Sequence, residues 1–132
     1  MSIRVVRLGS PRLPGEGLRM GTVRRPPRGV RKEDYARRDY YDVWVPELAP
    51  DSELVSWALS EPFTGKRWTK YERAYRAQMR KPPASRLISM LAALSHQTDF
   101  SIGCYCENEA KCHRSILRDL LANAGATFAE DN

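Results

Sequence analysis

The sequence has no long apolar segment, few cysteines and no internal repeats. No apolar run approaches the ~20 residues that span a bilayer, and the first residues, MSIRVVRLGSPR, lack the apolar core of a signal peptide. Of only three cysteines, Cys104 and Cys106 stand too close along the chain for an ordinary disulfide. These absences argue against a membrane partner and a disulfide framework. They predict a cytoplasmic protein with reduced thiols.

The residues that are present fit one α/β domain. The chain has 132 residues, 42% of them hydrophobic, which suits one domain with one core. Alternating apolar residues predict strands at 3–8, 18–23 and 99–106, and the apolar, β-branched run 41–48 predicts a strand or extended segment stopped by Pro46. Helical spacing predicts helices at 50–60, 64–80, 82–97 and 112–126. We expect loops at 9–17 and 24–32, and a short helix or an irregular segment at 33–40.

This order of strands and helices predicts a small, mainly parallel sheet flanked by helices, in a Rossmann-like, three-layer arrangement. We expect the single domain to cover residues 1–126, with residues 127–132 as a C-terminal tail. In such sheets ligands bind beyond the carboxyl ends of the strands. An arginine-rich loop follows the predicted strand 18–23, and a cysteine-rich loop follows the strand 99–106. Both loops are therefore candidate sites.

Positive charge is concentrated in the N-terminal third. Residues 1–38 hold eleven Lys/Arg and three Asp/Glu, a net charge of +8, whereas residues 39–132 carry −2. Arginine supplies most of the cations, and its planar guanidinium suits phosphate or carboxylate. The pattern fits an anionic partner and equally fits a solvated basic surface, with Arg24, Arg25 and Arg28 paired to acidic neighbours.

The stretch CYCENEAKCHRS, residues 104–115, contains all three cysteines and His113. Cys104, Cys106, Cys112 and His113 match the ligand count of a structural zinc site. Their spacing argues against one, because two cysteines flanking one strand residue lie about 6.6 Å apart unless the chain bends. Adjacent helical residues also diverge by about 100°. The sequence therefore predicts no metal ligands and identifies no cofactor.

A thiol or anion site fits the same stretch better. Cys112 stands at the predicted start of a helix, where free N–H groups stabilise a thiolate or a bound anion. His113 and Arg114 adjoin it. The alternative is structural, with Cys104 filling the core as a small apolar residue and the other groups capping the helix. The Cys-x5-Arg loop of cysteine phosphatases is absent.

Several motifs together resemble one protein family. The motifs are a first strand ending RLG, the arginine loop RRPPRG, the two middle helices LAPDSELVSWA and RWTKYERAYRAQM, and the turn CYCENEAKCHRSIL. They resemble the domain of unknown function 488 family, and most closely its YeaO-like branch, over about residues 3–125. The resemblance implies a Rossmann-like fold and a site at the two loops, with Arg24, Arg28 and Gly29 matching the arginine loop. It implies no particular reaction.

The sequence thus favours an anion-binding cleft, in an enzyme acting on a phosphorylated or nucleotide-like small molecule. Arg24, Arg28, Arg114 and Cys104 are the predicted substrate-binding residues, and Cys112 and His113 are the predicted catalytic residues. Two alternatives stay open. One is a nucleic-acid-binding module that uses the basic N-terminal third. The other is a thiol- or metal-dependent regulator.

Overall fold

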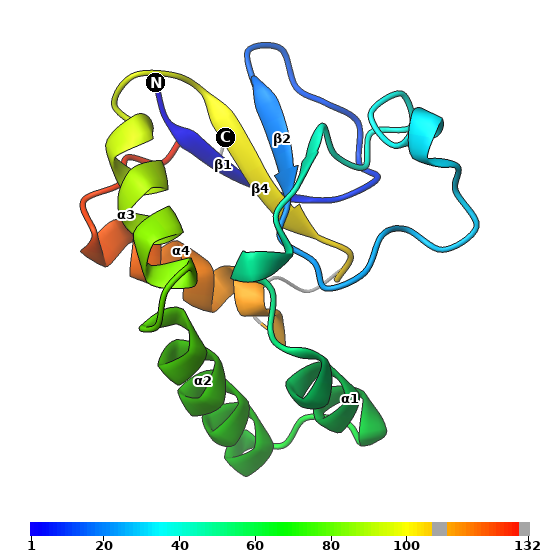
Figure 1. Cartoon of the computed structure of the whole chain (residues 1–132), viewed down its shortest axis with the longest axis vertical. Helices are drawn as coiled ribbons and strands as arrows, with labels where there is room; N and C mark the ends of the chain where they lie inside the picture. The colour runs from blue at the N-terminus through cyan, green and yellow to red at the C-terminus, as the bar shows by residue number, and fades with distance from the viewer. Residues whose placement is uncertain (107–110, 130–132) are drawn as a thin grey trace.

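The sheet of this protein has four parallel strands in the order β1-β4-β2-β3 (Figure 1). The computed structural model describes residues 1–106 and 111–129. The strands are β1 (Ile3–Arg7), β2 (Leu18–Gly21), β3 (Val43–Trp44) and β4 (Phe100–Cys104). β4 lies between β1 and β2 and is buried along its whole length. The predicted α/β fold with a parallel sheet is confirmed.

Four helices accompany the sheet: α1 (Ser52–Ser60), α2 (Gly65–Met79), α3 (Ala84–Leu94) and α4 (His113–Asn123). Two of the helices, α1 and α2, begin at side-chain caps. Asp51 Oδ1 accepts the Leu54 N–H at 2.8 Å, and Thr64 Oγ1 accepts the Arg67 N–H at 3.2 Å. Gly125, with φ of 97°, lies just beyond the end of α4. In the described residues, every helix is too short or too polar to cross a membrane.

Two segments depart from the predicted elements. The expected strand 41–48 contains only the two residues of β3, because Pro46 opens a 3₁₀ turn, η2 (Pro46–Leu48). The ambiguous segment 33–40 begins in a second 3₁₀ turn, η1 (Lys32–Asp34). The described part of the expected tail lies beside β1, where the Ala129 N–H donates to the Ile3 carbonyl at 2.8 Å.

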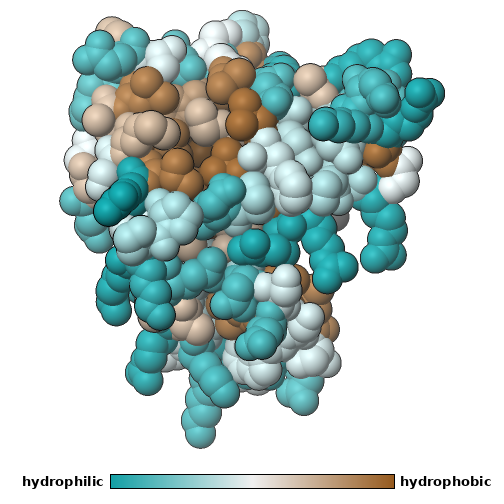
Figure 2. Space-filling view, in the orientation of Figure 1, coloured by the Kyte–Doolittle hydropathy of each residue, from teal (hydrophilic) through white to brown (hydrophobic). Residues whose placement is uncertain are grey.

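The two faces of the sheet are covered differently. Side chains alternate along the strands, and Ile3, Met20, Phe100 and Ile102 pack with the helices in the main apolar core. The opposite face is covered by loops, with Tyr41 against Gly21. Figure 2 shows that the surface over α1 and α2 is mostly hydrophilic, with an apolar area over α3 and the adjoining part of the sheet.

The loop-covered face contains a buried ion pair between Glu16 and Arg19. Both side chains are at most 1% exposed, and the guanidinium donates to both carboxylate oxygens, at 2.8 and 3.0 Å. Ser101 and the Leu13 N–H donate to the same carboxylate. Burial by itself raises the pKa of Glu16, but the bonds from Arg19 and Leu13 outweigh it and lower that pKa. This pair fastens β2 to the preceding loop and to β4.

Replacing Glu16 with Gln should destabilise the fold by about 3–5 kcal/mol, because it leaves the Arg19 charge buried without a counterion. The free energy of unfolding from urea denaturation measures the effect. Glu33→Gln is the matched control, since Glu33 meets Arg31 at 3.5 Å on an exposed surface and should cost less than about 1 kcal/mol. Equal losses in the two variants would contradict this role for the buried pair.

Candidate functional site

The two candidate loops meet at the carboxyl ends of the strands. Arg24 follows β2, Cys104 ends β4, and Cys112 directly precedes α4. A pocket of about 330 Å³ opens between these elements and α1. Its lining includes four of the six predicted site residues: Arg24, Cys104, Cys112 and His113. The structure therefore brings these four residues together at one pocket.

The rest of the lining combines apolar groups with further cations and sulfur. α1 and the start of α2 supply an apolar wall, and the loops supply two cations and the third cysteine. These residues are Val23, Arg25, Pro50, Val55, Ala58, Leu59, Phe63, Tyr71, Tyr105, Cys106 and Lys111. Sequence reasoning missed most of them. Arg25 belongs to the arginine loop that the sequence already singled out, and Lys111 could have been found as the neighbour of Cys112, but nothing in the sequence marks Phe63 or Leu59.

Two of the predicted anion-binding arginines donate hydrogen bonds to backbone carbonyls. Arg24 donates to the Pro50 and Ala49 carbonyls at 2.9 and 3.1 Å. Arg114, only 4% exposed, donates to the Val6 carbonyl at 2.6 Å and to the Cys106 carbonyl at 2.7 Å. Arg114 is therefore not part of the pocket lining, and it positions the turn at Tyr105 and Cys106 that follows β4.

Arg28, the third predicted arginine, is exposed and is not among the residues that line the pocket. Arg25 is also exposed, but it lies on the lining. Among the described residues, no partner holds the Arg25 guanidinium. Lys111 lies over the Trp68 ring, with its ammonium 5.3 Å from the ring centroid. Arg25 and Lys111 are thus two exposed cations on the lining of the pocket.

The acidic residues expected to pair with the arginine loop bind other arginines. Asp42 accepts two bonds from Arg12, and Asp39 lies 3.3 Å from the same guanidinium. Arg31 and Arg37 also have carboxylate partners, and Arg19 is buried. Among the described residues, these carboxylates therefore pair with arginines outside the loop RRPPRG, and the expected pairing of Arg24, Arg25 and Arg28 with acidic neighbours is not seen.

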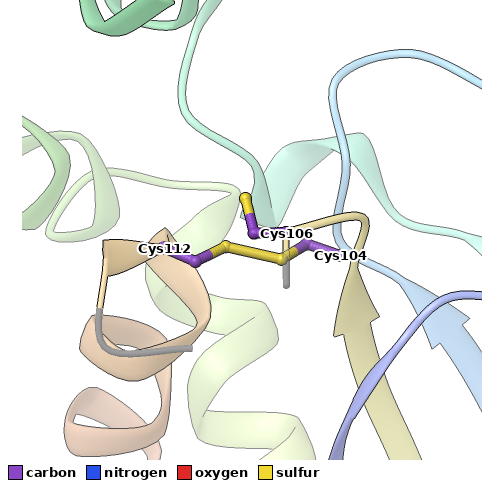
Figure 3. A group of neighbouring side chains, drawn as sticks. All are labelled: Cys104, Cys106 and Cys112. Carbon is purple, nitrogen blue, oxygen red and sulfur yellow. A yellow bond between two sulfur atoms is a disulfide. The ribbon is translucent and has the colours of Figure 1, made fainter. Parts of the chain in front are cut away.

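The three cysteines lie together at one end of the pocket (Figure 3). They come from the end of β4, the turn that follows it and the start of α4. The expectation of reduced thiols differs from the structure, which joins Cys104 and Cys112 by a disulfide. The end of β4 places the Cys104 sulfur next to the sulfur of Cys112, which lies eight positions further along the chain. Cys106 is free, and the Sγ atoms of all three lie within 4.8 Å of one another.

The Cys106 thiol is subject to opposing influences. Cys106 is exposed as a residue, but the atoms around its sulfur partly desolvate the thiol and raise its pKa, and this effect outweighs the lowering by the positive charges of Arg114 and Arg7. The thiol is therefore mostly protonated at neutral pH in the described structure. A bound cation in contact with the sulfur would reverse this balance and favour the thiolate.

His113 is a neutral imidazole with a defined tautomer. Its Nε2 faces the Thr22 carbonyl, which can only accept, so Nε2 carries the proton. Its Nδ1 then has a free lone pair, 3.6 Å from Cys112 Sγ. Complete burial lowers the pKa of His113 to about 4. The ring can accept a proton from a group in the pocket but carries no positive charge at neutral pH.

The aromatic side chains of α2 belong to the core or pack against it. Tyr75 is fully buried, and its hydroxyl donates to the Leu48 carbonyl at 2.7 Å. Tyr71 is 5% exposed and stacks on Trp68 with ring centroids 5.4 Å apart. These rings pack in the core or against it. Tyr71 alone of the three also lines the pocket.

The buried His113 should make stability fall as the solution is acidified. Its pKa is about 4 in the folded state against an ordinary 6.5, so between these values the unfolded state binds more protons. Stability is complete above pH 6.5 and is lost toward pH 4, by up to about 1.4 kcal/mol per pH unit. Urea denaturation of wild type and His113→Asn between pH 6.5 and 5 measures this slope.

The His113→Asn variant should lose that slope, whereas His96→Asn should keep it, since His96 lies on the surface at the Gly125 carbonyl. A slope that is the same in wild type and His113→Asn would show that the pH dependence has another source.

Comparison with known proteins supports the family resemblance. The family model DUF488-N3a, described as the active DUF488-N3 subclade, matches residues 3–125. Neither the comparison with curated proteins nor that with solved structures found a match. The matched region contains the arginine loop, the three cysteines and α4. On this evidence the chain belongs to the DUF488 family.

Proposed function

We propose that the pocket binds a phosphorylated or nucleotide-like small molecule and is the active site of an enzyme. The observation that carries the proposal is the composition of this one pocket. Cations from two loops, a neutral imidazole, three sulfurs and an apolar wall surround a volume of about 330 Å³. That volume lies within the usual range for small-molecule sites.

The cations support binding of the anionic group. Arg25 is exposed on the lining, and Lys111 directly precedes the N-cap residue of α4. A phosphate near the start of α4 would gain from free backbone N–H groups as well as from these side chains. Arg24 and Arg114 contribute differently from the sequence prediction: they hold the carbonyls that shape the pocket.

The apolar wall supports an organic part in the ligand. Phe63, Leu59 and Val55 face the pocket across from the sulfur cluster. A bare inorganic anion would leave this surface in contact with water. A sugar–base unit or a similar ring would cover it, which favours a nucleotide-like ligand over a simple anion.

His113 supports a catalytic role. Its Nδ1 lone pair is available for proton transfer at neutral pH, and the Thr22 carbonyl fixes the tautomer. The description of the matching family as active is in keeping with an enzyme. The proposed compartment is the cytoplasm, where thiols are kept reduced.

Nucleic acid remains the second candidate partner, through the basic N-terminal third. The ion pairs of Arg12, Arg19 and Arg31 weaken this candidate, because they occupy side chains that phosphate contacts would need. Gel retardation of DNA and RNA at low and high salt tests it. Absence of retardation at low salt would remove it.

Titration calorimetry with nucleoside monophosphates and with inorganic phosphate tests the main proposal. Arg25→Ala should weaken binding of both probes on the order of tenfold or more, because a charge-assisted bond contributes about 1.5–3 kcal/mol. Phe63→Ala should weaken the nucleotides and leave phosphate unchanged.

Arg28→Ala is the matched control, since Arg28 is an exposed arginine of the same loop outside the pocket. It should bind both probes as wild type does. Equal losses in the Arg25 and Arg28 variants would show a general charge effect of the loop. Absence of binding to every probe would contradict the proposed function.

A further inference from the structure

We infer that Cys104, Cys106 and Cys112 form a three-thiolate site for a zinc-type metal ion, with its fourth coordination position open to the pocket. The sequence predicted no metal ligands here. The site goes beyond the proposed function and does not depend on it, because it requires only the three sulfurs and their surroundings.

The sulfur positions carry the inference. All three Sγ atoms lie within 4.8 Å of one another. Zinc binds thiolates at about 2.3 Å, which places two sulfurs of a tetrahedral site about 3.8 Å apart. Small movements of side chains at the end of β4 and the start of α4 therefore suffice to place one ion among the three. A soft thiolate set selects zinc or a similarly soft ion over magnesium or calcium.

The backbone spacing also favours an ion between the sulfurs. The Cα atoms of Cys104 and Cys112 are 7.9 Å apart, whereas disulfides usually join Cα atoms about 4.4–6.8 Å apart. Two metal–sulfur bonds reach further than one sulfur–sulfur bond. The positions of β4 and α4 are thus better suited to a shared ion than to a direct link.

A bend after β4 removes the objection that the sequence raised. In an extended strand Cys104 and Cys106 would be too far apart to share an ion. β4 ends at Cys104, and the chain turns through Tyr105. Arg114 fixes the turn by donating to the Cys106 carbonyl at 2.7 Å. The turn places the Cys106 sulfur within 4.8 Å of the other two sulfurs.

The surroundings suit a negatively charged metal centre. Three thiolates and a divalent ion carry a net charge of −1. The Arg114 guanidinium donates to the Cys106 carbonyl at 2.7 Å and so places a positive charge beside the sulfurs, and the N-terminus of α4 adjoins Cys112. Each thiol releases its proton when the metal binds.

His113 lies beside the three sulfurs, outside the group that could share one ion. Three protein ligands with an open fourth position are the arrangement of catalytic rather than structural zinc. All three cysteines line the same pocket as Arg25 and Lys111. A water molecule or an anionic oxygen of a ligand could occupy the open position.

Metal binding and the Cys104–Cys112 disulfide exclude each other, since the ion needs both sulfurs as thiolates. The test therefore uses the full chain, purified with a phosphine reductant, incubated with zinc and passed over a chelating resin. Elemental analysis should find about one zinc per chain. Replacement by Co²⁺ should give the intense near-ultraviolet band of cobalt–thiolate bonds.

Cys106→Ser should weaken zinc binding on the order of 100-fold, because it removes one of the three ligands. Cys106 is exposed on a turn, so this variant should keep the circular dichroism spectrum of wild type. Cys106→His restores a third ligand atom and should retain zinc more tightly than the serine variant.

Two results would overturn the site. One is zinc far below one equivalent in the reduced wild-type chain. The other is equal zinc affinity in wild type and Cys106→Ser. Thiol titration of denatured protein prepared without reductant gives a further check: one thiol per chain indicates the disulfide form, and three support the thiolate site. Phosphate and nucleotide titrations on the metal-free Cys106→Ser variant test the proposed function separately.

Discussion

The carboxyl end of the sheet depends on one buried side chain, Arg114. Its guanidinium holds the end of β1 through the Val6 carbonyl and the turn after β4 through the Cys106 carbonyl. Because Arg114 belongs to the first turn of α4, these two bonds also fix where that helix begins. The position of Cys112, the shape of the cysteine turn and one side of the pocket all follow from this contact.

Much of the fold was predictable because it depends on local patterns. The alternation in IRVVR and FSIGC and the caps at Asp51 and Thr64 determine strands and helices within a few residues. The failures have causes that alternation and helical spacing do not reveal. β3 contains only two residues because a proline starts a turn. The loops that cover the second face of the sheet depend on the ion pair between Glu16 and Arg19, which no periodic pattern in the sequence predicts.

The position of the candidate site in the fold was predictable from the sequence, but the contacts that its individual residues make were much less so. Parallel strands bring their carboxyl ends together, so the convergence of Arg24 with Cys112 followed from topology. A sequence does not show whether an arginine faces a pocket or a backbone carbonyl, and Arg114 bonds to carbonyls whereas Arg25 lies on the pocket lining. The distance between the Cys104 and Cys106 sulfurs was not predictable from their spacing for a related reason. The chain bends at Tyr105, and Arg114 of α4 holds this bend by donating to the Cys106 carbonyl.

The pairing of residues 127–129 with β1 matters for the behaviour of the protein in a crowded solution. An unpaired outer strand offers a row of N–H and C=O groups to other chains. Here the Ile3 N–H and carbonyl are bonded to Thr127 and Ala129. At the opposite edge β3 is two residues long and is followed closely by Pro46, which has no N–H to donate. A sheet whose edges offer so few open hydrogen-bonding positions is a poor template for fibril growth.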